Sequence, residues 1–226
     1  MASAAHPRAA PASIPELGFA VEGATALEYA AVPTVEFALR VDATGGEQIR
    51  SILLDVQIQI AARRRPYDAH STEQLTDLFG TPDRWGETLR TLPWTRPTVI
   101  VPPFTGSTVV AVPVTCTYDL EVSAAQYLQS LGDGAVPLEF LFSGTVFFAG
   151  AGGALQTVRI PWTQEAEFAL PVSTWREAID RHFPDAAWLR LGRASFERLR
   201  AYRAREAHAS WDETVSALLA GRDGER

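Results

Sequence analysis

Histidine and cysteine, the side chains that most often ligate transition metals or act as nucleophiles, are few and scattered in this chain. The histidines are His6, His70, His182 and His208, and the single cysteine is Cys116. A zinc site takes about three or four such ligands, commonly in closely spaced pairs, and the sequence contains no pair of that kind. It therefore predicts no metal site and no cofactor.

Cys116 lies in a segment of alternating apolar residues, 107–119, which is typical of a strand. A thiolate nucleophile needs partial exposure and a basic neighbour, whereas a buried free thiol behaves as a small apolar side chain. We therefore predict that Cys116 is a buried structural thiol. A single cysteine also cannot form an internal disulfide, which favours a reducing compartment such as the cytosol.

Two carboxylates, Glu165 and Glu167, lie two residues apart on a predicted strand, and so share one face about 7 Å apart. That spacing would suit the acid and base of an inverting glycosidase. A solvated strand face explains the pair more simply. Ser143-Gly144 lies inside a strand pattern and not at the strand-to-helix turn of a hydrolase nucleophile. An enzyme whose site is assembled from scattered residues stays open as an alternative.

Arginine and tryptophan residues are stronger candidates for functional residues, as contacts to a partner protein. The triplet Arg63-Arg64-Arg65 follows a predicted strand, and the sequence Pro-Trp-Thr occurs twice, at Trp94 and at Trp162. Arginine forks recognise carboxylates, and tryptophan supplies large interface anchors. We therefore predict that these five residues contact a partner protein, although solvated arginines and loop packing are the simpler explanations.

A third concentration of arginine lies on a predicted helix over 193–205, which includes Arg198 and Arg203. Three interpretations remain open: a solvated helix face, a surface for an acidic protein partner, and a weak contact with RNA. We add Arg198 and Arg203 to the candidate partner-binding residues.

The overall charge limits the possible partners. The 226 residues include 27 acidic and 20 basic side chains, all of the latter arginine, for a formal net charge of −7. Such a chain has no general attraction for nucleic acid or anionic membranes. No segment approaches the roughly 20 apolar residues of a membrane-spanning helix, and residues 1–18 lack the apolar centre of a signal peptide. We predict a cytosolic protein that neither enters membranes nor binds nucleic acid strongly.

Strands must position most of these residues. Period-two hydrophobicity, typical of antiparallel strands with one wet face, recurs along the middle of the chain. It predicts seven strands, at 34–42, 49–61, 98–104, 107–119, 137–149, 155–160 and 164–170. Residues 138–142 are apolar on both faces, which indicates a central strand, and Pro113 indicates an edge or a bulge. The pattern favours a two-sheet sandwich.

Helical signals lie between the strands and after them. Ser71 and Thr174 are predicted N-caps, and Gly80 and Gly221 are predicted helix ends. The predicted fold is α+β: an antiparallel β-sandwich with short inserted helices and a C-terminal helical subdomain. The predicted division is a flexible tail over 1–14, the sandwich over 15–171, and helices over 172–221.

Those C-terminal helices are short, so we expect them to pack on the sandwich as one cooperative unit. The side chains expected to be buried in that contact are Trp175, Trp188, Phe196 and Leu199.

Several strings, in order along nearly the whole chain, carry a family resemblance. They are Leu78-Phe79-Gly80, Arg84-Trp85-Gly86, Pro103 to Thr108, Pro113 with Cys116 to Asp119, Phe140 to Phe147, Trp188 to Leu191, and Trp211-Asp212. Together they resemble an uncharacterised family of actinobacterial proteins, a domain of unknown function. The resemblance implies genes near those of high-affinity nickel-iron hydrogenases, and no assigned catalytic residues. It favours a non-catalytic binding or accessory module with an acidic protein partner, and the gene neighbourhood points to a hydrogenase-related one.

Overall fold

The computed structural model describes residues 14–45, 48–117, 119, 122–150, 153–184, 186 and 190–223. The chain forms two compact units, Met1–Ala187 and Trp188–Arg226. The first contains two antiparallel sheets with short helices, so the predicted α+β sandwich is confirmed. The tail predicted for residues 1–14 falls outside the described residues, apart from Ile14.

The smaller sheet has three strands in the order β1 (Glu16–Ala26), β2 (Thr34–Thr44) and β6 (Ser107–Thr115). Alternate side chains of β2 point into the core, because successive residues of a strand face opposite ways. Val35, Phe37, Leu39 and Val41 are fully buried as a result. Pro113 lies in β6 and pairs with Glu36 of β2. β6 is an edge strand, which suits proline because proline has no amide hydrogen to donate to a second neighbouring strand.

The larger sheet has six strands. They are β3 (Ile49–Ile60), β4 (Leu92–Thr95), β5 (Thr98–Val101), β7 (Ala135–Ala149), β8 (Leu155–Arg159) and β9 (Glu165–Pro171). β7 lies at the centre, as predicted, because β3 pairs along one side while β8 and β9 pair in succession along the other. A turn over residues 160–164 therefore interrupts the edge strand of this sheet.

The alternation of apolar and polar residues in the sequence did not predict strands β1 and β4. β1 is rich in Ala and Gly, and a bulge at Glu22 shifts its register against β2. β4 has only four residues. Both lie next to strands that the sequence did identify, so tertiary pairing completes them.

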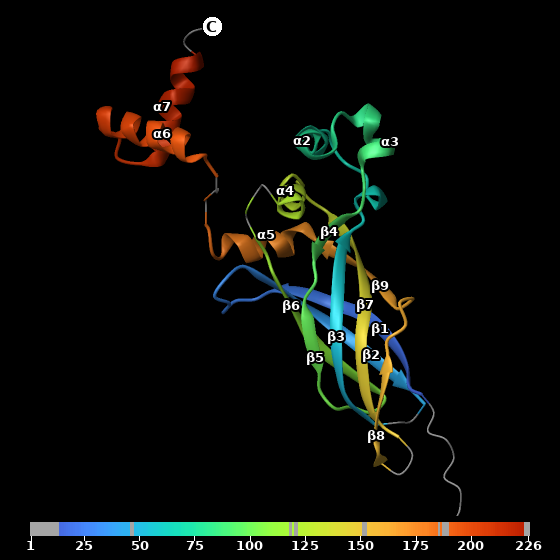
Figure 1. Ribbon diagram of the computed structural model, residues 1–226. Coiled ribbons are helices and arrows are strands. Elements are labelled where there is room, and N and C mark those ends of the chain that lie inside the picture. The colour runs from blue at the N-terminus through green and yellow to red at the C-terminus, as the bar shows by residue number, and fades with distance from the viewer. Residues whose placement is uncertain are drawn as a thin grey trace, which may run out of the picture. The chain divides into compact units, whose positions relative to one another are not determined.

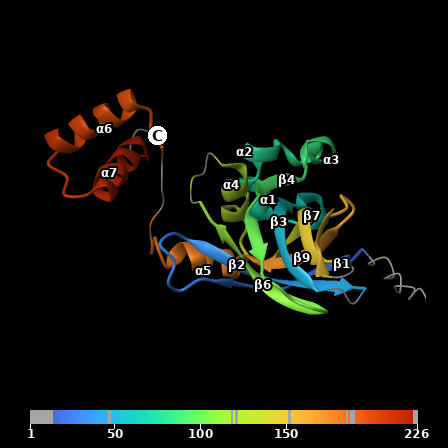
Figure 2. The same ribbon diagram turned by 60° about the horizontal axis from the view of Figure 1, so that its bottom comes forward.

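The two sheets pack face to face, and Figure 2 shows them as two layers. Aromatic rings join the layers. The Phe37 ring of β2 meets Phe140 of β7 edge-on at 5.2 Å, and Phe19 of β1 stacks on Phe142 of β7 at 4.3 Å.

Gly144 sits where β7 comes closest to β3. Its φ of +148° is one that side chains rarely adopt, and its register partner is Leu54. A Cβ built on Gly144 would overlap the carbonyl oxygen of Leu53 and lie 3.1 Å from that carbonyl carbon. The glycine is therefore required for the close approach of the two strands.

Short helices gather at one end of the sheets, where β3 ends and β7 begins (Figure 1). They are η1 (Ala62–Arg64), α1 (Ala69–Gln74), α2 (Thr76–Phe79), η2 (Pro82–Arg84), α3 (Trp85–Thr88) and α4 (Ser123–Gln129). The predicted cap Ser71 is wrong: Asp68 caps α1 by accepting a 2.7 Å hydrogen bond from the Ser71 amide. Gly80, with φ of 75°, ends α2 as predicted.

The first C-terminal helix, α5 (Val172–Asp180), belongs to the first unit. It starts directly after Pro171 with no side-chain cap, so the capping box predicted at Thr174 is wrong. Trp175, only 2 % exposed, packs against the sandwich core as expected.

The second unit contains α6 (Arg193–Arg205) and α7 (Trp211–Asp223). The expected burial of Phe196 and Leu199 is wrong: Phe196 is 40 % exposed and α6 buries no residue, while Trp188 falls outside the described residues. Polar arginines take up so much of α6 that little apolar surface remains to bury. Packing of these two helices on the sandwich stays a prediction.

Two local signals for α7 had different outcomes. The Ser210 hydroxyl accepts a 3.0 Å hydrogen bond from the Glu213 amide, as an N-cap does. Gly221 does not end the helix, which continues to Asp223.

Candidate functional site

Arg63 and Arg64 lie in η1, just after β3, and Arg65 directly follows η1. Each of the three guanidinium groups binds within the chain. Arg63 donates to the carbonyl oxygens of Leu89 and Gly86, the latter at 3.0 Å. Arg65 donates to the carbonyl oxygens of Asp133 and Ala135 at 3.0 and 3.3 Å. These bonds tie α3, the residue after it and the start of β7 to the segment that follows β3, which gives both side chains a structural role.

Arg64 bridges two carboxylates from neighbouring strands. Its Nη2 lies 2.8 Å from Glu139 of β7 and its Nη1 2.5 Å from Glu167 of β9. The two glutamates are direct register partners, and like charges in that position repel each other. Arg64 offsets the repulsion, and the hydrogen bond to Glu167, followed by the charge of Glu139, raises the pKa of Arg64.

The two carboxylates of the predicted pair, Glu165 and Glu167, therefore have different surroundings. Glu167 is engaged by Arg64, and Glu165, one step along the same face, adds to the field at that arginine. A charge-paired strand face accounts for this arrangement without a glycosidase acid and base.

The two Pro-Trp-Thr tryptophans have opposite environments. Trp94 of β4 is half-buried, and its ring meets Phe37 of the core edge-on at 6.2 Å. Trp162 lies in the turn between β8 and β9 and is 90 % exposed. Of the two, only Trp162 has an exposed ring, and its contact with a partner stays a prediction.

The α6–α7 unit combines exposed apolar side chains with arginines. Trp211, Val215, Leu218 and Leu219 recur at helical spacing along α7 and are all more than one-third exposed. We call these four residues, together with Phe196 of α6, the α6–α7 apolar stripe. The Phe196 ring lies 5.7 Å from that of Trp211, which continues the stripe from one helix to the other.

Arginines of α6 accompany this stripe. The Arg203 guanidinium lies 4.7 Å over the Trp211 ring, and it donates to the carbonyl oxygens of His208 and Ala209 at 3.2 and 2.7 Å. Arg203 thus fixes the turn between the helices. Arg193 and Arg198 have no hydrogen bond or ion pair with any residue that the structure describes, and both are exposed.

The charge of the chain is unevenly distributed between its two units. Residues 188–226 contain eight arginines and six acidic residues, whereas residues 1–187 contain twelve arginines and 21 acidic residues. The second unit is thus a slightly basic segment of an acidic protein.

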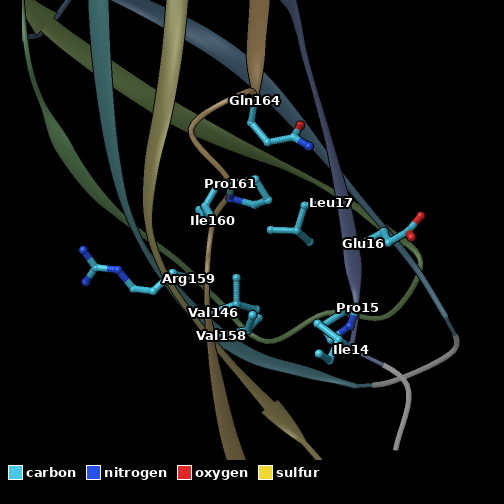
Figure 3. A pocket seen from close by; sticks show the side chains of 10 residues that line it. All are labelled: Ile14, Pro15, Glu16, Leu17, Val146, Val158, Arg159, Ile160, Pro161 and Gln164. Carbon is cyan, nitrogen blue, oxygen red and sulfur yellow. The ribbon is translucent and has the colours of Figure 1, made fainter.

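An apolar pocket of about 340 Å³ opens in the first unit, where β1 begins beside β7 and β8 (Figure 3). Its lining is Ile14, Pro15, Glu16, Leu17, Val146, Val158, Arg159, Ile160, Pro161 and Gln164. Three of these belong to the turn that interrupts the edge strand, which Trp162 also occupies. Sequence reasoning missed this pocket, because no single segment contributes more than four of its residues.

Clusters of metal-ligating side chains are absent from the part of the chain that the structure describes. It holds no cluster of three or more His, Cys, Asp or Glu able to bind a metal ion. An open polar groove of about 390 Å³ brings His70 and Asp77 together with amide and hydroxyl side chains of α4 and its end. Burial raises the pKa of the Cys116 thiol to about 12, so this thiol is protonated at neutral pH, as expected of a structural cysteine.

None of the described helices has the length and apolar character needed to span a membrane. A search of curated proteins gave no match. A family model described as a family of unknown function, DUF6084, does match, over residues 14–226.

Solved structures resemble the chain only weakly. The CARDB domain of the Pyrococcus furiosus PF1109 protein, solved in complex with di-metal ions, is 12 % identical with a TM-score of 0.28, over 70 % of this chain and 92 % of that one. A Kluyveromyces marxianus β-glucosidase is 9 % identical with a TM-score of 0.25, over 70 % of this chain and 15 % of the enzyme. For β-glucosidase 3B of Thermotoga neapolitana the values are 11 % and 0.25, over 69 % and 17 %.

This chain therefore spans only a small part of those glucosidases, and similarities at this level carry no argument about metal binding or hydrolysis. The family match covers nearly the full length, and the chain belongs to the DUF6084 family of unknown function.

Proposed function

We propose that this protein is a non-catalytic binding module that captures an acidic protein partner through its α6–α7 unit. The observation that carries the proposal is the α6–α7 apolar stripe, accompanied on α6 by arginines without partners among the described residues. Exposed apolar side chains of this extent mark interaction surfaces. Apolar anchors and arginine forks also contribute most to binding energies at interfaces.

Charge defines the partner's chemistry. Arg193 and Arg198, which have no partner among the residues that the structure describes, can pair with carboxylates of the partner. Arg203 is held against Trp211 and shapes the surface beside it. A partner helix with one apolar face and flanking Asp or Glu residues matches both features. Rim charges of this kind mainly raise the association rate, and salt weakens their effect.

RNA is the competing partner for a basic helix. The apolar stripe favours protein, because non-specific RNA contacts rely on phosphate charge and on aromatic platforms for stacking bases. Val215, Leu218 and Leu219 provide neither.

Capture from a lysate, with identification of the bound protein, tests the proposal in the full-length chain. The variant Arg193→Ser/Arg198→Ser removes two of the five arginines of α6, the two without partners among the described residues. Arg84→Ser/Arg90→Ser makes the same charge change at exposed positions of the first unit. We expect the first variant to lose most capture of an acidic protein and the control to keep it. The difference should shrink as salt increases from about 50 to about 300 mM, since the Debye length then falls below about 10 Å.

Three results would count against this function. Equal capture by both double variants would show that Arg193 and Arg198 do not contribute to partner binding. Loss of capture after nuclease treatment would favour RNA. Turnover of a metabolite by the wild type, with no protein captured, would favour the enzyme alternative.

The finer parts of the prediction are tested by the same material. A hydrogenase subunit among the captured proteins would support the accessory role near nickel-iron hydrogenases that the family resemblance implies. The cytosolic location and the partner contacts of Arg63–Arg65, Trp94 and Trp162 stay predictions. A Trp162→Ala variant in the same capture assay examines the exposed member of that set.

A further inference from the structure

We propose that the pocket between β1, β7 and β8 binds a small, uncharged and mainly apolar molecule that carries one hydrogen-bonding group. This site lies in the first unit and does not depend on the partner proposed for α6–α7.

The pocket is built from both sheets of the sandwich. Leu17 comes from the start of β1, Val146 from β7 and Val158 from β8. Val146 and Val158 are register partners, so their side chains lie next to each other on the inner face of the larger sheet. Val146 is almost fully buried. The pocket is therefore an opening into the sandwich core and not a groove on its outer face.

The interrupted edge strand explains why the sandwich opens here. After β8 the chain turns at Ile160 and Pro161 before β9 begins, and β1 lies beside β9. The turn is fixed at both ends, because the Ile160 amide donates to the Gly144 carbonyl at 3.1 Å and the Phe142 amide donates to the Gln164 carbonyl at 3.0 Å. The wall that the turn forms is thus held by backbone bonds to β7, which makes the pocket preformed.

Size sets the first limit on a ligand. A volume of about 340 Å³ lies at the lower end of the range of small-molecule sites. It is about twice the size of an apolar cavity that binds benzene. A molecule of about ten carbon atoms, such as a fused bicycle or a short branched chain, fits this space.

Polarity sets the second limit. Figure 3 shows the Arg159 guanidinium and the Glu16 carboxylate pointing away from the other lining side chains. The Gln164 amide lies at one end of the pocket, and it is the uncharged polar side chain among the lining residues. With no charged group pointing inward, an anion such as a phosphate ester would lose its hydration without compensation. One amide can satisfy one hydroxyl or carbonyl of a ligand.

The test is a titration of the full-length protein with three related probes, in which NMR spectra record the chemical shifts of the backbone amides. 2-Naphthol is uncharged with one hydroxyl, naphthalene has none, and 2-naphthoate is an anion of similar size. We expect saturable binding of 2-naphthol that shifts amides of β1 and β8, several-fold weaker binding of naphthalene, and at least ten-fold weaker binding of 2-naphthoate.

Two matched variants locate the binding. Val158→Phe fills the pocket from β8, whereas Thr157→Phe places the same ring on the opposite face of the same strand. We expect Val158→Phe to weaken 2-naphthol binding at least ten-fold and Thr157→Phe to leave it unchanged, with both proteins still showing cooperative thermal unfolding. Gln164→Leu should remove the preference for 2-naphthol over naphthalene.

The proposal is overturned if neither uncharged probe binds saturably to the wild type, or if Val158→Phe binds 2-naphthol as well as Thr157→Phe does. Tighter binding of 2-naphthoate than of 2-naphthol would overturn the uncharged class of ligand. If Val158→Phe does not fold, the shifted amides in the wild type decide: shifts confined to α6 and α7 would refute this pocket.

Discussion

Adding a single methyl group at Gly144 tests both the packing of β7 against β3 and the wall of the pocket. In Gly144→Ala the new Cβ has no space, because it would overlap the Leu53 carbonyl oxygen and lie 3.2 Å from the Cα of Leu54. It would also hold alanine at φ of +148°, which L side chains rarely adopt. Either β7 moves away from β3 or the backbone changes conformation, and both responses disturb the central strand pair.

The cost has two components. A residue held in a glycine-only region of the backbone costs about 1–3 kcal/mol. Forcing an extra methyl group into a packed site costs about another 1–3 kcal/mol. The neighbours of Gly144 are backbone atoms, which cannot rotate away as a flexible side chain can. We therefore expect Gly144→Ala to lower the free energy of unfolding by about 3–5 kcal/mol.

Gly23→Ala is the matched control, since it makes the same chemical change in β1. Nothing lies within 4 Å of a Cβ at Gly23, and its φ is not positive. Removing a glycine at such a position restricts the unfolded chain, so we expect a change of less than about 1 kcal/mol, in the stabilising direction.

Urea unfolding followed by circular dichroism measures both variants at equilibrium, with the slope of the transition compared to confirm a common unfolded state. Gly144→Ala within about 1 kcal/mol of the wild type would refute the close approach of β3 and β7 at this position. A loss in Gly23→Ala as large as that in Gly144→Ala would show that the cost is general to glycines in these strands. Because the Gly144 carbonyl accepts the Ile160 amide, a folded Gly144→Ala should also bind 2-naphthol more weakly.

Three further predictions concern stability and reactivity. Trp175→Ala should lower the free energy of unfolding by about 3–5 kcal/mol, because the ring is buried against the core. Trp162→Ala should change it by less than about 0.5 kcal/mol, because that ring is exposed. Urea unfolding measures both, and a small loss for Trp175→Ala or a large one for Trp162→Ala would contradict the burial of that ring. Cys116 should resist iodoacetamide until the protein unfolds, and rapid alkylation of the native protein at about pH 8 would contradict this. Because the pKa of its thiol is raised from 9.0 to about 12 in the folded protein, the stability that the buried thiol provides should be complete below about pH 9 and be lost as the pH rises toward 12. Ala207→Gly should raise the melting temperature of the transition that includes α6 and α7 by relieving a φ of 57°, equivalent to about 0.5–1 kcal/mol; an unchanged or lower melting temperature would count against that backbone conformation.

Much of the fold was determined by the sequence alone, because burial on one face of a strand imposes a period of two that is visible without a structure. The alternation over 34–42 identified β2, and the two-sided apolar run over 138–142 identified the centre of β7. Pro113 marked an edge strand, because it lacks the amide that a central strand needs. These signals are local, and each depends on a side chain's own chemistry.

The tertiary structure decided what those residues do, because function here depends on neighbours that are distant in the sequence. Arg64 is drawn into a bridge by Glu139 and Glu167, whose pairing follows from the register of β7 and β9. Trp94 and Trp162 share a tripeptide, yet one lies against the core and the other is exposed. The pocket exists because the start of β1 lies next to β7 and β8, more than 100 residues later in the chain, and no local pattern records that juxtaposition.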